Sequence, residues 1–374
     1  MPTNIHIVGT AGIPANYGGF ETLAEQLSMK LTEVGDVEVT VYCSGWRRKA
    51  QSFSANRVRR IFFPISAHGA RGLIYDLLSL IFSGLAGADV VLLLGAAPGI
   101  FLPLFRVLCP NVLVVVNIDG VEWRREKWGV GTKFFLKLAE TLAAKYSDAV
   151  VADNVEISKL LLERLGIDSE LIAYGGDHVS TSPKGELANE LKDARALNGY
   201  DLFVGRAELE NNLHIICAAY ASKAHLHLLV VTNATTTPFG RRLLRDFSGF
   251  KNITFADPIF DVDKLSLIRK NARLFLHGHS AGGTNPALVE AMFFEKQIYC
   301  YDCAFNRETT ENKALYWKSV EDIHALLEGG KNGTFDCGLS LLRIAHRRYR
   351  WEVIVEDYRR LLTNLGCCAQ TSWL

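Results

Sequence analysis

Nearly continuous apolar runs alternate with helical stretches along most of this sequence, and this alternation limits the folds open to it. In the first half, the runs fall at residues 4–10, 37–44, 58–65, 89–95, 112–120, 148–153 and 170–177. Strands covered by helices on both faces have such continuous apolar runs, whereas strands with one wet face alternate apolar and polar residues. The pattern therefore predicts a doubly wound α/β domain with a mostly parallel sheet.

A polar segment without a strand, residues 178–198, separates this set from a second one. The later runs fall at residues 201–207, 226–234, 252–259, 273–280 and 297–302. A length of 374 residues suits two domains. We therefore predict two Rossmann-like domains, 1–178 and 179–350, followed by a C-terminal segment, 351–374, that opens with an amphipathic helix.

Composition excludes several classes of protein. A hydrophobic content of 49% with 22% charged residues is typical of a globular chain. The formal net charge of +1 argues against a nucleic-acid partner. The charge is nevertheless uneven, because no acidic residue lies between Glu38 and Asp76. The basic residues of this acid-free stretch are Arg47, Arg48, Lys49, Arg57, Arg59, Arg60 and Arg71.

The most apolar region, Gly72 to Ile118, is broken by charges and prolines. Its longest charge-free run is shorter than the ~18 residues of a membrane-spanning helix, so we interpret the region as buried sheet core. The chain opens without a signal-peptide pattern, which predicts a cytoplasmic protein with reduced cysteines. Cys300 and Cys303 form a lone C-x-x-C pair, which we interpret as small buried side chains.

Ligands of open α/β sheets bind at the carboxyl ends of the strands, so the residues after each strand are the candidates for a site. After the first strand, GTAGIPANYGGFETLAEQL lacks the G-x-G-x-x-G fingerprint, which removes most support for a nicotinamide or flavin cofactor. Gly18 and Gly19 open the next helix instead. Their amides could approach an anion at a helix N-terminus, or the pair could form only a flexible turn.

The segment HGHSAGGTNPALVE, His277 to Glu290, repeats this arrangement in the second half. Asn285 suits a helix N-cap and Pro286 the first helical position, so we interpret residues 282–286, with Gly283 and Thr284, as a phosphate cradle. Glu290 follows about one turn later. It could accept hydrogen bonds from ribose hydroxyls, or be a solvated surface glutamate.

Other charged and aromatic residues follow strands in both halves. Arg206 directly follows the strand at 201–205, where its fixed positive charge suits a diphosphate. Asp119 ends the strand at 112–120 and is expected to face a cleft between the domains. Trp123, Arg124 and Trp128 are placed near the mouth of that cleft, where tryptophan rings could stack on a sugar or serve as core filler.

No metal site is predicted. Asp261 and Asp263 spell D-x-D, but they directly precede a helical stretch, so we interpret them as cap and first-turn charges. His277 and His279 are two residues apart in strand-like sequence, and we expect their side chains to point to opposite faces. One of the two is expected to face the cleft as a hydrogen-bond donor, not as a metal ligand, and His279 is counted among the residues that bind the sugar donor.

Seven blocks, in order along the chain, resemble a known family. They are IVGTAGIPANYGGFETLAEQL, NIDGVEWRREKWG, ADNVEISKLL, IAYGGD, VGRAELENN, HGHSAGGTNPALVEAM and FNRETTENKALYW. Together they resemble retaining glycosyltransferases of the GT-B fold, and within these a bacterial rhamnosyltransferase-like subgroup of surface-polysaccharide synthesis. The resemblance implies two domains facing across a cleft, with the C-terminal helix crossing back to the first domain.

The resemblance also implies roles for matching residues. Gly18 and Gly19 would lie near the donor phosphates, with Arg206 on the diphosphate. Thr284 and Asn285 would contact phosphates, and Glu290 the donor ribose. Asp119 stands where many relatives have a histidine beside the transferred sugar. The implied donor is a nucleoside diphosphate sugar, used without a metal or other cofactor. The implied acceptor is a glycan or lipid-linked sugar, reached by peripheral contact with the anionic inner face of the plasma membrane.

Two positions depart from the wider family. Gly282 replaces the first glutamate of its E-x7-E motif, and Asn211 replaces a lysine five residues after the arginine. Both departures are features of the rhamnosyltransferase-like subgroup. Two other functions stay open at this point: a sugar-nucleotide 2-epimerase, which uses the same fold, and a non-catalytic nucleotide-binding assembly partner.

Overall fold

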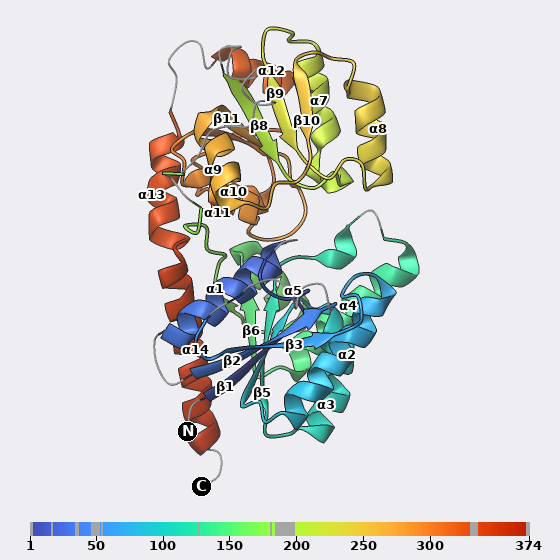
Figure 1. The fold of residues 1–374 in the computed structure, drawn as a ribbon, viewed down its shortest axis with the longest axis vertical. Helices are drawn as coiled ribbons and strands as arrows, with labels where there is room; N and C mark the ends of the chain where they lie inside the picture. The colour runs from blue at the N-terminus through green and yellow to red at the C-terminus, as the bar shows by residue number, and fades with distance from the viewer. Residues whose placement is uncertain are drawn as a thin grey trace. The chain divides into compact units, whose positions relative to one another are not determined.

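The computed structural model divides the chain into two compact units, each built on one parallel sheet (Figure 1). The first unit comprises Met1–Arg124, Trp128–Ala173 and Trp351–Leu374, and the second comprises Arg125–Lys127 and Tyr174–Arg350. The described residues are 3–15, 18–33, 37–45, 53, 55–125, 128–179, 182–183, 199–329 and 336–371. Most of the linker expected at 178–198 lies outside these residues.

The first sheet has seven parallel strands in the order β3-β2-β1-β4-β5-β6-β7. Their bounds are β1 Thr3–Val8, β2 Val37–Ser44, β3 Val58–Phe63, β4 Val90–Leu94, β5 Leu113–Ile118, β6 Ala149–Ala152 and β7 Glu170–Leu171. All five residues of β4 are buried, as are five of the six in β5. The continuous apolar runs therefore correspond to central strands covered on both faces, which confirms the predicted doubly wound architecture.

Helices cover both faces of this sheet (Figure 1). They are α1 Gly19–Glu33, α2 Ala70–Leu85, η2 Ala97–Phe101, α3 Leu102–Leu108, η3 Glu122–Arg124, α4 Val130–Tyr146, α5 Val155–Leu165 and α14 Trp351–Thr371. Helix α14 belongs to the first unit although its sequence follows the second, as predicted. Its buried Tyr358 hydroxyl accepts a hydrogen bond of 2.6 Å from Asn117 Nδ2 at the end of β5.

The second sheet has six parallel strands in the order β10-β9-β8-β11-β12-β13. They are β8 Tyr200–Val204, β9 Leu228–Val231, β10 Ile253–Ala256, β11 Ala272–His277, β12 Gln297–Tyr301 and β13 Leu315–Trp317. The helices are η4 Leu209–Asn211, α7 Leu213–Ala221, α8 Pro238–Phe247, α9 Val262–Asn271, α10 Pro286–Met292, α11 Ala304–Thr309, α12 Val320–Gly329 and α13 Gly338–Arg348. Strand β13 was not predicted, because its three residues are too few to show a pattern.

Two sequence-based expectations were wrong in part. The strand expected at 170–177 is β7, which has only two residues. The chain then enters the second unit, where Gly176 N donates a hydrogen bond of 2.8 Å to Tyr349 O. The region 72–118 is also not wholly buried core. Strand β4 is buried, but Leu85 of α2 and Val107 of α3 are 79% and 78% exposed. Among the described residues, no helix is long and apolar enough to cross a membrane.

Candidate functional site

The loops that follow β8 and β11 lie at one edge of the second sheet. These two strands are hydrogen-bonded neighbours and run parallel, so both loops leave from their carboxyl ends. Arg206 lies in the first loop, and His279 in the second, which runs from 278 to 285 into α10. The structure therefore brings these two predicted residues to the same edge of the sheet.

Asn211 ties the two loops together. Its Nδ2 donates a hydrogen bond of 2.7 Å to Arg206 O, and its Oδ1 lies 2.7 Å from His279 Nδ1. Because the Nδ2 end is committed as a donor, Oδ1 must be the acceptor, so the proton of the neutral His279 ring lies on Nδ1. His279 Nε2 is then an acceptor. The Nδ1 proton of His279 is therefore directed at Asn211.

The second loop is also fixed by backbone contacts. Ser280 N donates a hydrogen bond of 2.9 Å to Glu210 O, and Asn212 Nδ2 donates one of 2.9 Å to Gly278 O. A Cβ atom at Gly278 would lie 2.0 Å from Asn211 O, so only glycine permits this approach. Side-chain and backbone hydrogen bonds therefore tie the two loops at this edge of the sheet to each other.

The site carries a free positive charge beside a neutral imidazole. The Arg206 side chain is exposed, and it has no hydrogen bond or ion pair among the described residues. Burial lowers the pKa of His279 well below its usual value, and the neighbouring His277, Arg125 and Arg206 lower it further. His279 is therefore neutral near pH 7. An exposed guanidinium without a carboxylate partner is suited to an anionic ligand.

His277 and His279 do not diverge, which corrects the sequence-based expectation. Their ring centroids are 6.4 Å apart. Residues two apart in a strand share a face, and β11 ends at His277, so His279 already belongs to the loop. His277 Nε2 is buried without a hydrogen-bond partner in the part of the chain described here. Burial lowers the pKa of His277 to about 4.

Helix α10 begins as the sequence predicted. Asn285 is the N-cap, its Oδ1 accepts a hydrogen bond of 3.0 Å from Ala287 N, and Pro286 is the first helical residue. Gly283 and Thr284 are buried directly before the cap. Gly282 has a φ of +102°, which glycine adopts readily and a glutamate would not. A glutamate at position 282 would therefore be strained in this backbone conformation.

Glu290 is not a solvated surface residue. Its Oε2 forms an ion pair with the buried Arg269 of α9, and its Oε1 lies 3.3 Å from His178 Nε2. Burial acts to raise the pKa of Glu290, but Arg269 and His178 outweigh it and lower the pKa to about 2. A carboxylate has about four lone-pair sites, so Glu290 can still accept a ligand hydroxyl.

In the first unit, Gly18 directly precedes α1 and Gly19 begins it. The preceding loop is held by carboxylates of the same helix. Ala11 N donates to Glu21 Oε1 at 3.0 Å, and Ala15 N donates to Glu25 Oε2 at 3.1 Å. A carboxylate in the first turn of a helix is stabilised by the positive end of the helix dipole. Two of the loop amides therefore already have anionic partners.

The other predicted residues of the first unit lie after β5. Asp119 follows the strand directly and is half-buried. Trp123 Nε1 donates a hydrogen bond of 3.0 Å to Glu140 Oε2. Three cations lie 5.2–5.3 Å from the Trp123 ring, namely Arg124, Lys137 and Arg164. This cluster occupies the ring with cation–π contacts. Trp128 is half-buried and Arg124 is exposed.

The described residues contain no cluster of three or more histidine, cysteine, aspartate or glutamate side chains that could hold a metal ion. Asp261 is the N-cap of α9, and its Oδ1 accepts a hydrogen bond of 2.8 Å from Lys264 N, which confirms the cap interpretation. Cys300 and Cys303 are free thiols, one buried and one half-buried, and burial raises the pKa of both.

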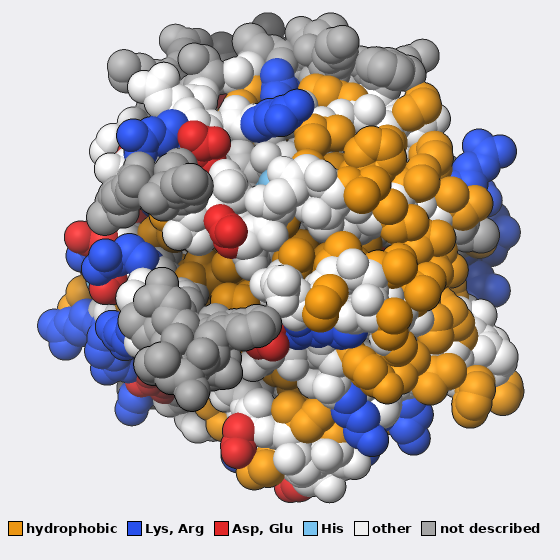
Figure 2. Space-filling view, turned by 90° about the horizontal axis from the view of Figure 1, so that it is seen from below, with side chains coloured by type: hydrophobic (Ala, Val, Ile, Leu, Met, Phe, Trp, Pro, Cys, Tyr) orange, Lys and Arg blue, Asp and Glu red, His pale blue; other side chains and the backbone are white. Residues whose placement is uncertain are grey.

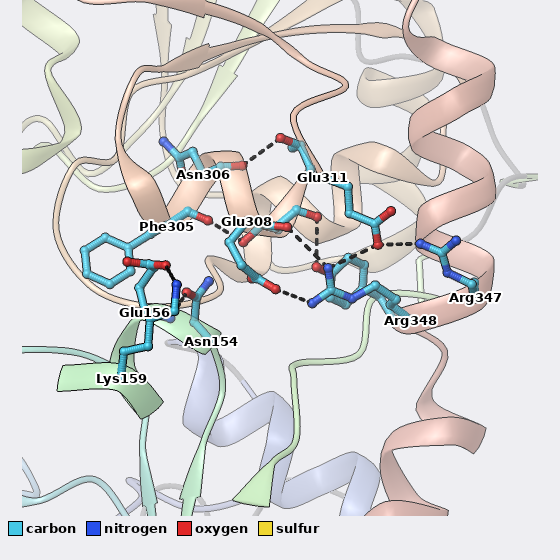
Figure 3. A network of polar contacts seen from close by, with 12 residues as sticks. Asn154, Glu156, Lys159, Phe305, Asn306, Glu308, Glu311, Arg347 and Arg348 are labelled. Carbon is cyan, nitrogen blue, oxygen red and sulfur yellow. Dashed lines mark hydrogen bonds and ion pairs between the residues drawn. The ribbon is translucent and has the colours of Figure 1, made fainter. Parts of the chain in front are cut away.

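Helix α11 holds the backbone of the loop that carries His279. Asn306 Nδ2 donates a hydrogen bond of 2.8 Å to His279 O. The end of α11 and the turn that follows it are held by α13, as Figure 3 shows. Arg348 Nη2 pairs with Glu308 Oε1 at 2.5 Å, and Arg347 pairs with Glu311. The block FNRETTEN thus orients the backbone of His279.

Sequence reasoning missed three residues of this site. Asn211 was noted only as a departure, while His178 and Arg269 were not singled out. His178 directly follows the block IAYGGD, which was a usable signal. Arg269 lies within an ordinary helical stretch and gave none. Its partner, Glu290, is 21 residues away.

Comparisons with known proteins agree with this architecture. Residues 2–177 match a family model described as a domain of unknown function, DUF1972. The search of curated proteins finds no match. In fold, the chain is similar to sucrose-phosphate synthase from Thermosynechococcus elongatus, with a TM-score of 0.80 and 16% identity, covering 98% of this chain and 100% of that one.

Two further solved structures are similar. HepE from Anabaena, solved in complex with UDP, has a TM-score of 0.71 and 12% identity, covering 97% of this chain and all of that one. The trehalose-6-phosphate synthase OtsA has a TM-score of 0.72 and 12% identity, covering 97% of this chain and 99% of that one. At these identities the similarity establishes the fold. The chain has the two-domain GT-B architecture, as the sequence predicted.

Proposed function

We propose that this protein is a glycosyltransferase that moves a sugar from a nucleoside diphosphate sugar to a hydroxyl group. The proposal is carried by one observation: the exposed Arg206 guanidinium at the carboxyl edge of the second sheet, beside a neutral His279 and without a carboxylate partner among the described residues. The fold supports it, because HepE, of the same architecture, was solved with UDP and with UDP and glucose.

Arg206 would bind the diphosphate of the donor. The leaving group of such a transfer is a nucleoside diphosphate, so the main catalytic need is to stabilise the negative charge that develops on it. A fixed guanidinium can do this through two parallel hydrogen bonds. In this proposal no metal or other cofactor is needed. The α10 segment with Gly283, Thr284 and Asn285 would add backbone donors, as would Gly18 and Gly19.

Glu290 and His279 would recognise the rest of the donor. Glu290 is held ionised by Arg269 and His178, so its carboxylate is ready to accept hydrogen bonds from ribose hydroxyls. His279 Nε2 would accept a hydrogen bond from a hydroxyl of the donor. Asn211 would keep that acceptor in place by holding the ring through Nδ1.

We further propose that the transfer retains the anomeric configuration, with the leaving phosphate taking the proton of the acceptor hydroxyl. Asp119 would position the transferred sugar or stabilise positive charge on its ring, and Trp128 and Arg124 would contact the acceptor. The cations around Trp123 argue for a structural role of that ring. Rhamnose is the favoured sugar, and a growing surface polysaccharide or lipid-linked oligosaccharide the favoured acceptor. The protein would work in the cytoplasm, in peripheral contact with the membrane.

Donor binding tests the proposal directly. Titration calorimetry with dTDP-rhamnose, UDP-sugars and GDP-sugars should find one nucleoside diphosphate class that binds. Arg206→Ala should weaken that binding by about tenfold to hundredfold, because a hydrogen bond to a charged group contributes about 1.5–3 kcal/mol. Arg242→Ala is the matched control, since Arg242 of α8 is also exposed and has no partner within the described residues.

The outcomes separate the alternatives. Unchanged affinity and turnover in Arg206→Ala would remove the diphosphate role. Conversion of the donor into an epimer, with no acceptor present, would identify a 2-epimerase. Tight nucleotide binding without hydrolysis or transfer to any acceptor would identify a binding partner. Loss of transfer in Asp119→Asn, with donor affinity kept, would support the role proposed for that carboxylate.

A further inference from the structure

Three helices of the first unit present a broad apolar surface to solvent. Helices α2, α3 and α4 lie side by side on one face of the first sheet (Figure 1), with α3 in contact with both others. In the view of Figure 2, hydrophobic side chains gather on the right, with lysine and arginine side chains at the margin of this area. We call these outer positions of α2, α3 and α4 the apolar face. Its most exposed members, each 55–87% exposed, are Ile74, Leu85, Leu104, Val107, Leu108, Val130 and Phe134.

The charges on these helices have one sign at the surface. Arg71 of α2 and Lys137 of α4 are exposed, as is Lys145 near the end of α4. The three helices contain only two carboxyl groups. Asp76 is half-buried, and burial raises its pKa to about 7. Glu140 is buried and paired with Arg164. The three helices therefore carry exposed cations and no exposed carboxylate of their own; Asp148, which is exposed and follows α4, is paired with Arg106 of α3.

Part of the acid-free stretch borders the same region. Arg57 and Arg59 are exposed and line a hollow of about 350 Å³ at the amino ends of β1, β2 and β3. Ala86, which directly follows α2 and Leu85, lines it too, together with Glu38. Arg47, Arg48 and Lys49 lie outside the described residues. Arg57 and Arg59 thus continue the cationic margin of the apolar face.

We propose that the apolar face is the surface that docks on an anionic lipid bilayer. Contiguous exposed apolar area with a polar rim marks an interaction surface. Apolar side chains flanked by lysine and arginine match the boundary between anionic headgroups and acyl chains. A second copy of this chain fits less well, because a twofold contact would bring the cations of one copy against those of the other.

This inference rests on the proposed membrane contact and names the surface that makes it. The apolar side chains would enter the headgroup region, while the cations would attract the anionic lipid. Binding should therefore require both anionic lipid and the exposed apolar residues, and it should weaken as salt rises.

Vesicle flotation of the full chain, without any donor, tests the proposal. The probes are vesicles of phosphatidylcholine alone and of phosphatidylcholine with phosphatidylglycerol. The test variant combines Leu85→Ser, Val107→Ser and Val130→Ser, one from each helix. The control variant combines Leu162→Ser, Phe260→Ser and Val262→Ser, which are also exposed, at 45–58%, but lie elsewhere. All six positions are at the surface, so both variants are expected to fold.

The wild type and the control variant should float with the phosphatidylglycerol vesicles. The test variant should bind them at least about tenfold less. Equal flotation of the test variant, or no flotation of the wild type, would overturn the proposal. So would a wild-type dimer, seen by analytical ultracentrifugation, that the test variant converts to a monomer. Arg206→Ala should still float, so failure of the docking surface and failure of the transferase proposal are distinguishable.

Discussion

Neutralising Glu290 should destabilise the second unit strongly, and the size of the effect follows from its surroundings. The pKa of Glu290 falls from 4.5 to about 2, because Arg269 and His178 outweigh the opposing effect of burial. Each pKa unit corresponds to about 1.4 kcal/mol, so ionisation of this carboxyl contributes about 3 kcal/mol at neutral pH. Glu290→Gln would also leave the buried Arg269 without its counter-charge, which costs about 3–5 kcal/mol in comparable pairs.

The assay is urea denaturation at pH 7, followed by tryptophan fluorescence. Trp317 is the only tryptophan between residues 174 and 350, and it is buried, so its emission reports on the second unit. Replacing the tryptophans of the first unit would remove their emission and leave that of Trp317. Glu328→Gln is the control. Its ion pair with Lys223 is at the surface, where such pairs contribute about 0–1 kcal/mol.

The pH dependence provides a second check. The folded state lowers the pKa of Glu290, so its contribution is complete above about pH 4.5 and is lost as the pH falls towards 2. The difference in stability between wild type and Glu290→Gln should shrink over that range. A loss below 1 kcal/mol at pH 7, or a difference that is the same at pH 7 and pH 3, would refute the pairing as the source of the effect.

Three other results are expected. Gly278→Ala should destabilise the second unit and weaken nucleotide binding, because the added Cβ would lie 2.0 Å from Asn211 O. Gly249→Ala, where a Cβ meets nothing within 4 Å, should leave both unchanged in calorimetry. Burial keeps His277 neutral in the folded state, with a pKa lowered from 6.5 to about 4. The free energy of unfolding should therefore fall as the pH drops from about 6.5 to 4, and denaturation curves of His277→Asn should show a smaller fall. Donor affinity should not rise between pH 8 and 6, since His279 stays neutral there; an increase on acidification would show that His279 gains a proton.

Local features of the site could be predicted because their causes lie within a few residues. Asn285 caps α10 and Asp261 caps α9 through hydrogen bonds to amides two and three residues away. The strands could be predicted for a related reason. Burial on both faces of a parallel sheet requires a continuous apolar run, and β4 and β5 show it in the sequence itself.

The extent of the apolar face could not be predicted. Apolar sequence between 72 and 118 has the same composition whether it is covered or exposed. Only the three-dimensional packing decides that β4 lies inside while Leu85 and Val107 face outward. The strand count shows a related limit, since β13 gains its strand conformation from pairing with β12 and not from its own three residues.

The sequence by itself determined that this chain forms two parallel α/β units, and it located the loops that carry Arg206 and His279 and the helix that carries Glu290. The tertiary structure decided what those side chains are bound to. Asn211 reaches His279 across 68 residues, and Arg269 reaches Glu290 across 21. Propensity and periodicity act over a few residues. Hydrogen bonds and ion pairs between distant segments depend on which strands become neighbours, and that is fixed only when the sheet forms.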